Sequence, residues 1–376
     1  MKEVLGRIFI HRREENWWMN ILVPITSIII ALIVGAIFIA STGRDPILAY
    51  KLMFGASGLI PGPYFKTHFA EMLLYTALFV STGLAFALPA RAGLFSIGAE
   101  GQFIVGAITA AFFGYWEPLY NLPGAIHIII IFVMVILIGG FWGLIAGILK
   151  AKKGINETII TIMLNWIAFH IIEGWLVPTG GPMSANVATG VSGTPYVSPS
   201  ARLPIILPGT RLNISILIML FVIYLAWFLL YRTVFGYEIR AMGYTAITNM
   251  EAPKIGGVNT EKRIMQIMFM GSAIAALGGS FVVLGFLGQY PPVFEGGYGF
   301  DGIAVALIGG NEPVGILFSA ILIGALRTGA TAVQLARIPK TFPAIIEGLI
   351  VAFIALEELM RYLLSMVLLK RKESVA

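Results

Sequence analysis

A few polar side chains lie inside long apolar runs of this sequence. The stretch LPARAGLFSIGAEGQF, residues 88–103, contains Arg91, Glu100 and Gln102, although only 12% of the residues in the chain are charged. A carboxylate at the centre of a membrane costs at least about 2.5 kcal/mol unless it is paired, protonated or in contact with water. Glu100 is therefore predicted either to join helices through hydrogen bonds or to line the path of a transported substrate.

A second set of polar side chains lies in KGINETIITIMLNW, residues 153–166. Thr158, Thr161 and Asn165 recur at helical spacing and form a stripe on one side of an otherwise apolar helix. Asn165 lies about 12 Å from the inner end of its predicted span, and Glu100 about 10 Å from the inner end of its own. Polar groups at similar depth on different helices predict a hydrogen-bonded network or a cavity.

The remaining candidates flank these two helices. Ser96 is predicted to lie one turn before Glu100 on the same helical face. Gly98 and Gly106 are predicted to serve close helix packing on the face of Gln102. The predicted substrate path consists of Ser96, Glu100, Gln102, Thr161, Asn165 and Asp301.

The elements that position these side chains are membrane spans. Hydrophobic residues make up 58% of the 376 residues, and the mean hydropathy is +0.89. A soluble domain carries about 25% charged residues, twice the share found here. Apolar runs of about 20 residues indicate an all-α polytopic membrane protein. Ten spans are predicted, at 21–40, 69–88, 94–113, 124–149, 157–177, 213–231, 264–287, 299–310, 313–330 and 343–365.

Local signals set the boundaries of these spans. Pro89 is expected to end the second span at Leu88. The third span is expected to begin near Gly93, with Arg91 reaching from the inner interface toward water. The eighth span is too short to cross an apolar core of about 30 Å as one helix. The eighth span carries Asp301, and glycines interrupt it as they interrupt the third span. Interrupted helices at corresponding positions of two inverted halves are typical of the substrate pathway of a transporter.

Basic residues set the orientation of the chain. Lys and Arg gather in the inside loops if the N-terminus is cytoplasmic, and ten spans return the C-terminus to the same side. These loops explain the net charge of +6, so no nucleic-acid partner is expected. The chain is predicted to be one domain, 1–376, with a cytoplasmic head (1–20), an external loop (178–212), a cytoplasmic loop (232–263) and a cytoplasmic tail (366–376). The external loop is either a connector or a docking surface for an outside partner.

Residue types and motifs that are absent from the sequence argue against several kinds of catalytic site. The chain has no cysteine, and its four histidines show no metal-ligand spacing, so neither a thiol nucleophile nor a metal site is expected. The hydrolase motifs Gly-x-Ser-x-Gly and His-Glu-x-x-His do not occur. No Gly-Lys pair occurs either, which excludes a P-loop. The chain is predicted not to be an enzyme, and ATP-driven transport needs another subunit that hydrolyses ATP.

Four segments carry a family resemblance: LPARAGLFSIGAEGQFIVGA, KGINETIITIMLNWIA, FGYEIRAMGYTAITNMEAPKIGG and GFDGIAVALIGGNEPVG. In this order they resemble permease subunits of ABC importers, in the branched-chain amino acid/ribose permease superfamily and, within it, the nucleoside and simple-sugar type. The resemblance implies a type II importer-like bundle of about ten transmembrane helices in the cytoplasmic (inner) cell membrane. Besides the lipid bilayer, the implied partners are ABC ATPase subunits that bind ATP and Mg²⁺, a second homologous permease or a copy of this chain, and an external substrate-binding protein. No cofactor is implied for this subunit.

The RAMG segment resembles the coupling region of this family, a short helix that enters a cleft of the ATPase. A helix from about Gly243 to Ala252 is expected to make that contact. The residues assigned to the contact are Arg240, Gly243, Thr245, Ala246, Thr248, Asn249 and Glu251.

Three functions are weighed. The leading one is an ATP-driven importer of a nucleoside or simple sugar that works by alternating access. The alternative is an ion- or proton-coupled secondary transporter, in which Glu100 or Asp301 carries the proton. A secondary transporter has no need of the charged cytoplasmic loop 232–263, which favours the importer. An intramembrane enzyme, the third class, lacks any pair of nucleophile and base.

Overall fold

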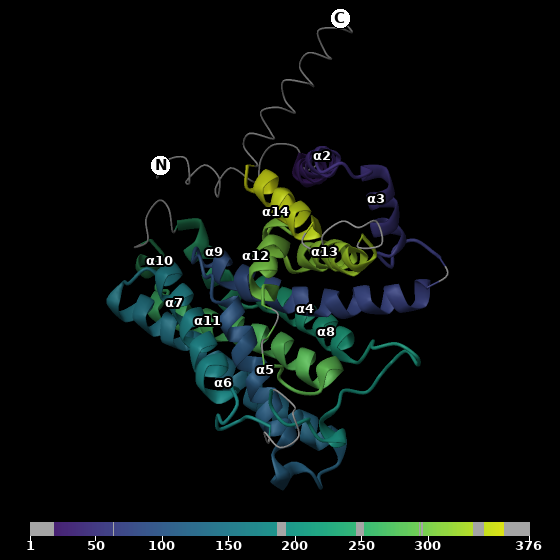
Figure 1. Cartoon of the computed structure of the whole chain (residues 1–376). Coiled ribbons are helices and arrows are strands. Elements are labelled where there is room, and N and C mark those ends of the chain that lie inside the picture. The colour runs from purple at the N-terminus through teal and green to yellow at the C-terminus, as the bar shows by residue number, and fades with distance from the viewer. Residues whose placement is uncertain are drawn as a thin grey trace, which may run out of the picture. The chain divides into compact units, whose positions relative to one another are not determined.

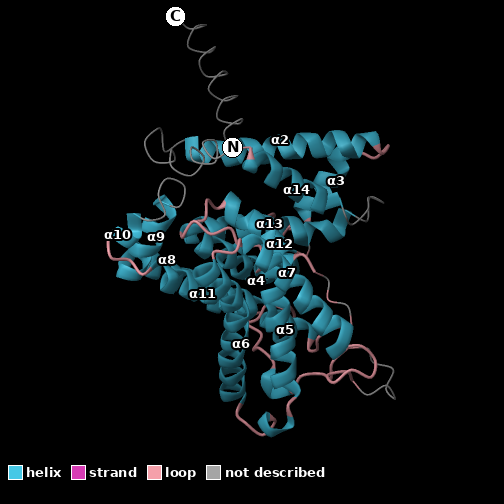
Figure 2. Cartoon of the chain, turned by 90° about the vertical axis from the view of Figure 1, so that its left-hand side faces the viewer, coloured by secondary structure: helices cyan, strands magenta, loops and turns pink. Residues whose placement is uncertain are grey.

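The computed structural model of the chain describes residues 19–62, 64–185, 193–245, 252–292, 294, 296–333 and 342–356. Helices joined by loops make up this part of the chain (Figure 2). The only β-type pairing within these residues is an isolated bridge between Ile205 and Asn213. The predicted all-α class is confirmed for the described residues.

The helices carry the labels of Figure 1. In chain order the α-helices are α2 (Met19–Ser41), α3 (Pro46–Gly55), α4 (Phe65–Arg91), α5 (Ala99–Tyr115), α6 (Gly124–Lys153), α7 (Glu157–Ile171), α8 (Ser215–Arg232), α9 (Val234–Thr245), α10 (Ala252–Ile255), α11 (Thr260–Val282), α12 (Tyr298–Ile308), α13 (Pro313–Val333) and α14 (Phe342–Ala355). The π-helical turns η3 (Ile172–Leu176) and η6 (Val283–Leu287) continue α7 and α11, and η2 (Glu117–Leu119) and η5 (Pro199–Ala201) are 3₁₀ turns.

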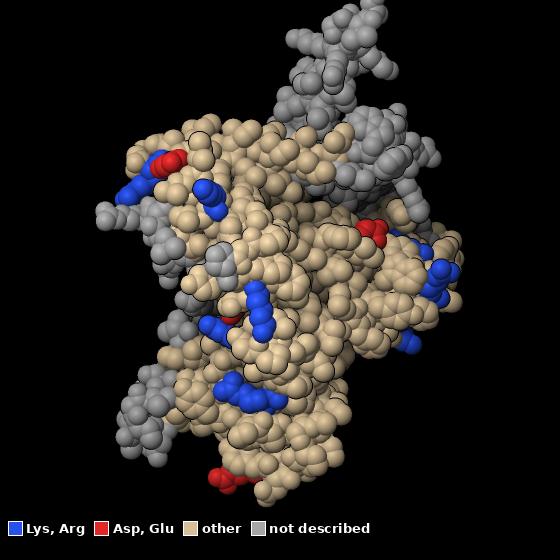
Figure 3. Space-filling model, turned by 90° about the vertical axis from the view of Figure 1, so that its right-hand side faces the viewer, with Lys and Arg blue, Asp and Glu red and all other residues tan. Residues whose placement is uncertain are grey.

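Each of the ten predicted spans overlaps a described helix, and the last part of the tenth, 357–365, lies outside the described residues. Among the described residues, six helical stretches are long and apolar enough to cross a membrane: Phe65–Arg91, Gly124–Lys153, Glu157–Leu176, Ser215–Arg232, Thr260–Leu287 and Pro313–Ala330. The helix α12 is apolar but short, as predicted. Residues other than Lys, Arg, Asp and Glu form most of the face shown in Figure 3. The chain is a multi-pass membrane protein, and the number of about ten crossings stays a prediction.

The boundary between α4 and α5 differs from the prediction. The helix α4 continues through Pro89 to Arg91, and Gly93 follows it in the left-handed conformation with φ of 77°. Residues 94–97 that follow are not helical, and the next helix begins only at Ala99. The predicted end at 88 and the predicted start near 93 are therefore wrong. Gly271 of α11 packs closely against Pro89 in this last turn.

One compact unit comprises Phe69–Gly324. Within it, α11 lies against α5 and α6 (Figure 1). A Cβ atom on Gly106 of α5 would lie 2.0 Å from the carbonyl oxygen of Ala276, and one on Gly279 of α11 would lie 1.9 Å from that of Phe103. The two backbones touch at these points, as membrane helices do where small residues face each other. The prediction of close packing at Gly106 is confirmed, and α5 buries 14 of its 17 residues.

The other compact unit joins Met1–His68 to Ala325–Ala376. In it α2 packs against α14, with the rings of Phe38 and Phe342 6.3 Å apart. The hydroxyl of Tyr50 in α3 donates to the carbonyl oxygen of Leu32 in α2 at 2.5 Å. The organisation of residues 1–376 as a single domain stays a prediction.

Candidate functional site

The chain at residues 94–97, between α4 and α5, is not helical, and side chains of α7 hydrogen-bond to its backbone. The N–H of Ile97 donates to Oγ1 of Thr161 at 3.1 Å, and Nδ2 of Asn165 donates to the carbonyl oxygen of Ile97 at 2.7 Å. The N–H of Gly101 donates to Oδ1 of Asn165 at 2.9 Å. Non-helical backbone persists at membrane depth only where protein groups or water satisfy it. The polar stripe of α7 therefore makes this irregular segment possible.

The start of α7 extends the same contact. Oγ1 of Thr158 donates to the carbonyl oxygen of Phe95 at 2.7 Å, and the N–H of Phe95 donates to Oε1 of Glu157 at 3.1 Å. The other oxygen of Glu157 pairs with Nζ of Lys150 at 2.7 Å. Charged partners strengthen such hydrogen bonds. Four side chains of α7 thus hold the backbone between Phe95 and Gly101 in a fixed position relative to that helix.

Glu100 binds the N-terminus of α12. Its Oε1 accepts from the N–H of Gly297 at 2.7 Å, and its Oε2 accepts from the N–H of Gly299 at 2.6 Å. The residue is 7% exposed, and its charge lies where the unpaired N–H groups and the dipole of α12 favour an anion. These bonds match the first predicted role of Glu100, which is to join helices. Its role in a substrate path stays a prediction.

The other predicted path residues lie near the starts of α5 and α12. Ser96 is buried in the non-helical segment, so its predicted place one helical turn before Glu100 is wrong, because α5 begins only at Ala99. Gln102 is buried in the first turn of α5, and Asp301 lies in the first turn of α12. Five of the six predicted residues thus meet around the start of α5, and the sixth lies on the helix that Glu100 binds.

Sequence reasoning missed a second carboxylate contact, which is half-buried. Glu173 in η3 accepts from the N–H of Phe294 at 3.0 Å and from the hydroxyl of Tyr290 at 3.2 Å. Tyr290 is fully buried, and its backbone N–H donates to Oγ1 of Thr194 at 3.0 Å. Glu173 and Glu100 therefore both fasten the chain that leads into α12. The one sequence feature that could have indicated this contact is an acidic residue, Glu173, inside the apolar run IIEGWL, residues 171–176.

Part of the predicted external loop 178–212 lies among the described residues and is bonded to the larger unit. The N–H of Val197 donates to the carbonyl oxygen of Gly288 at 2.8 Å, and the N–H of Ser198 donates to that of Gly114 at 2.8 Å. These bonds give the described part of the loop a fixed shape. A fixed shape suits a docking surface better than a loose connector does.

The predicted coupling residues are only partly described. Arg240, Gly243 and Thr245 lie in α9, and Ala246, Thr248, Asn249 and Glu251 lie outside the described residues. Gly243 lies near the end of α9 rather than at the start of a helix, which differs from the expected helix 243–252. The reason is that α9 buries residues at helical spacing (Gly236, Ile239 and Met242) and so begins at Val234.

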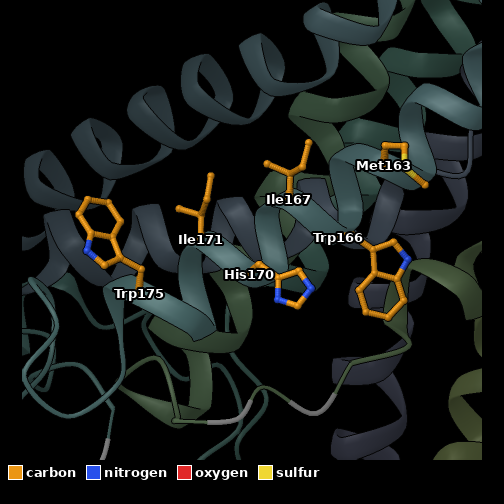
Figure 4. Close-up of a pocket in the computed structure, with 6 residues that line it drawn as sticks. All are labelled: Met163, Trp166, Ile167, His170, Ile171 and Trp175. Atoms are coloured by element: carbon orange, nitrogen blue, oxygen red, sulfur yellow. The ribbon is translucent and has the colours of Figure 1, made fainter.

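The opposite face of α7 is apolar, aromatic and exposed. A shallow hollow of about 530 Å³ there is lined by Met163, Trp166, Ile167, His170, Ile171 and Trp175 (Figure 4). The rings of Trp166 and His170 stack with their centroids 6.0 Å apart. In the part of the chain that the structure describes, no group of three or more His, Asp or Glu side chains could hold a metal ion. The helix α7 thus has one polar face bound to protein and one apolar face.

Comparison with known proteins supplies the family. Residues 69–368 match the family model described as branched-chain amino acid transport system / permease component. The chain is 33% identical over 355 residues to the guanosine ABC transporter permease protein NupP of Bacillus subtilis, an alignment that covers 92% of this chain and 96% of that protein. It is 29% identical over 356 residues to the nucleoside ABC transporter permease protein NupB of Lactococcus lactis subsp. cremoris, covering 93% and 94%. It is also 28% identical over 359 residues to the glucose ABC transporter permease protein TsgB13 of Haloferax volcanii, covering 92% and 90%. No solved structure gives a significant match.

Proposed function

Since the chain belongs to the family of branched-chain amino acid transport system permease components, we propose that it is the membrane subunit of an ABC importer for nucleosides or simple sugars. The observation that carries the proposal is the identity of 33% to a guanosine permease across 92% of this chain. Nucleosides are the first candidate substrates, because two of the three relatives above are named as guanosine or nucleoside permeases. Glucose is the candidate sugar, because the third is named as a glucose permease. The chain is a transport subunit and not an enzyme, since permeases of this family leave ATP hydrolysis to a partner subunit.

The proposal includes the rest of the complex. Two ATPase subunits, a second permease or a copy of this chain, and an external binding protein complete the importer. We place it in the inner cell membrane with both termini cytoplasmic, as the distribution of basic residues supports. The fixed shape of the described part of loop 178–212 supports docking of the binding protein on that side. Relatives named as ABC permeases give no support to the ion-coupled alternative.

The proposed substrate path follows the start of α5. Ser96, Glu100, Gln102, Thr161, Asn165 and Asp301 are its proposed residues. Thr161, Asn165 and Glu100 already hydrogen-bond protein groups, which supports a role in shaping the path rather than in gripping the substrate.

Reconstitution tests the function. The chain, its cognate ATPases and its binding protein are placed in liposomes, and uptake of radiolabelled guanosine and glucose is measured with and without ATP. We expect guanosine uptake that requires ATP and persists when a protonophore removes the proton gradient. Uptake that follows the proton gradient and ignores ATP would show a secondary transporter instead.

A bulky charge in the cytoplasmic loop 232–263 should disrupt the proposed contact with the ATPases. We expect Ala246→Arg and Thr248→Arg to weaken binding of the ATPases and to lower substrate-stimulated ATP hydrolysis at least tenfold, because a buried unpaired charge is costly at an interface. Ile155→Arg, in the exposed turn between α6 and α7, is the comparison variant, since that turn is the other candidate contact on the cytoplasmic side. If only Ile155→Arg loses hydrolysis, the contact with the ATPases lies in that turn.

A further inference from the structure

The short helix α12 is held at its two ends by charges of opposite sign. Its N-terminus binds the carboxylate of Glu100. After its C-terminus, Nε of Arg91 donates to the carbonyl oxygen of Asn311 at 2.9 Å, and Nη2 of Arg91 donates to that of Gly310 at 3.3 Å. An anion at the first end and a cation at the second both complement the helix dipole. The helix is therefore fixed by polar contacts at its ends as well as by packing.

Glu312 makes further contacts just after the C-terminal end of α12. It forms an ion pair with Arg91, the last residue of α4. Its other carboxylate oxygen accepts from the hydroxyl of Tyr231, near the end of α8. One carboxylate in the turn between α12 and α13 thus joins the ends of two other helices.

The helix α9 touches the same group. The guanidinium of Arg240 lies 4.9 Å from the centre of the Tyr231 ring, and it also donates to the carbonyl oxygen of Leu230. A Cβ atom on Gly243 would lie 2.2 Å from the carbonyl oxygen of Arg91, so the backbone of α9 contacts the end of α4 directly. A continuous chain of contacts therefore runs from α9 through Tyr231 and Arg91 to Glu312.

We propose that Glu312 is a positioning residue that transmits movement of α9 to α12. The proposal rests on the proposed function, in which α9 leads into the contact with the ATPase. Movement of α9 displaces Arg240 and Gly243, and with them Tyr231 and the end of α4. Glu312 contacts both Tyr231 and Arg91 at the end of α4, and so connects them to the turn after α12. Discrete polar contacts of this kind break and re-form between two arrangements, as a transport cycle requires.

The test uses the reconstituted complex and measures solute taken up per ATP hydrolysed. Glu312→Gln keeps the size of the side chain and removes its charge, and we expect the ratio to fall about fivefold or more, the usual lower range of coupling between sites. Tyr231→Phe keeps the ring under Arg240 and removes only the hydroxyl, so a smaller fall is expected. Glu71→Gln is the matched control, because it removes the ion pair of Glu71 with Arg211, at 3.3 Å, elsewhere on α4.

A ratio equal to that of the wild type in both variants overturns the proposal, even if less complex is recovered, because a purely structural role lowers the amount of transporter and not its coupling. If Glu312→Gln does not assemble, the ratio of Tyr231→Phe decides. Failure of the proposed function has a different signature. In that case the wild-type complex itself takes up none of the solutes on ATP.

Discussion

Replacing Glu100 with glutamine should lower both the thermal stability of the permease and its uptake of solute. The carboxylate accepts one backbone N–H on each oxygen, from Gly297 and Gly299. Glutamine keeps one acceptor and presents an amide N–H₂ to the other donor, which leaves a buried N–H unsatisfied at about 1–3 kcal/mol. Glu100→Ala leaves both unsatisfied, and we expect about twice that loss of folding free energy and an uptake at least tenfold lower.

Two measurements on purified protein separate the two roles of Glu100. The melting temperature reports the contact with α12, and uptake per folded complex reports the substrate path. A lower melting temperature with normal uptake per complex assigns Glu100 to helix joining alone. A loss of uptake per complex beyond the loss of stability supports the path. Glu117→Gln in η2 is the control, since Glu117 is exposed. A Glu100→Gln protein that matches this control in both measurements would contradict the contact.

Asn165→Leu should destabilise the permease at least as strongly. The amide of Asn165 donates to the carbonyl oxygen of Ile97 and accepts from the N–H of Gly101, and leucine of similar size does neither. Two backbone groups then lose their partners. The N–H of Gly101 is buried and costs about 1–3 kcal/mol when left unsatisfied, and the half-buried carbonyl oxygen of Ile97 adds a smaller cost. The measurement is thermal unfolding in detergent, together with the amount of protein that reaches the membrane.

Adding a methyl group at Gly101 of α5 tests the contact between α5 and α7 by steric crowding. A Cβ atom on Gly101 would lie 2.7 Å from Cα of Asn165, so Gly101→Ala should push α5 and α7 apart and lower stability while leaving the side chain of Asn165 unchanged. Ile159→Ala is the control on α7, because Ile159 is 59% exposed. Stability of Asn165→Leu within about 0.5 kcal/mol of the wild type, the range of ordinary surface substitutions, would contradict the proposed bonding.

Hydropathy predicted the helices of this chain well because long apolar runs have few other stable structures in a membrane. The stripe of Thr158, Thr161 and Asn165 was also visible, since it repeats at helical spacing. Its partner was not predictable in the same way. The stripe binds the backbone of residues 95–101, and backbone groups look alike at every position of a sequence.

The errors at the start of α5 have a local cause. Pro89 pointed to a helix end, but α4 continues beyond it to Arg91, where α11 packs against Pro89 at Gly271. Arg91 was expected to reach toward water, and instead it binds carbonyl oxygens after α12 and pairs with Glu312. These partners lie some 220 residues away in the sequence, where no local pattern identifies them.

The glycine contacts between α5 and α11 also bear on how the chain is made. The ribosome completes α5 about 160 residues before it reaches Ala276, onto which Gly106 packs. During that interval the bare backbone face of α5 has lipid, water or the translocon as its neighbour. The larger unit therefore cannot close while only its first helices have been synthesised. Final docking of α5 is a late event in biogenesis, and a chain cut short before α11 lacks the surface that α5 was shaped to meet.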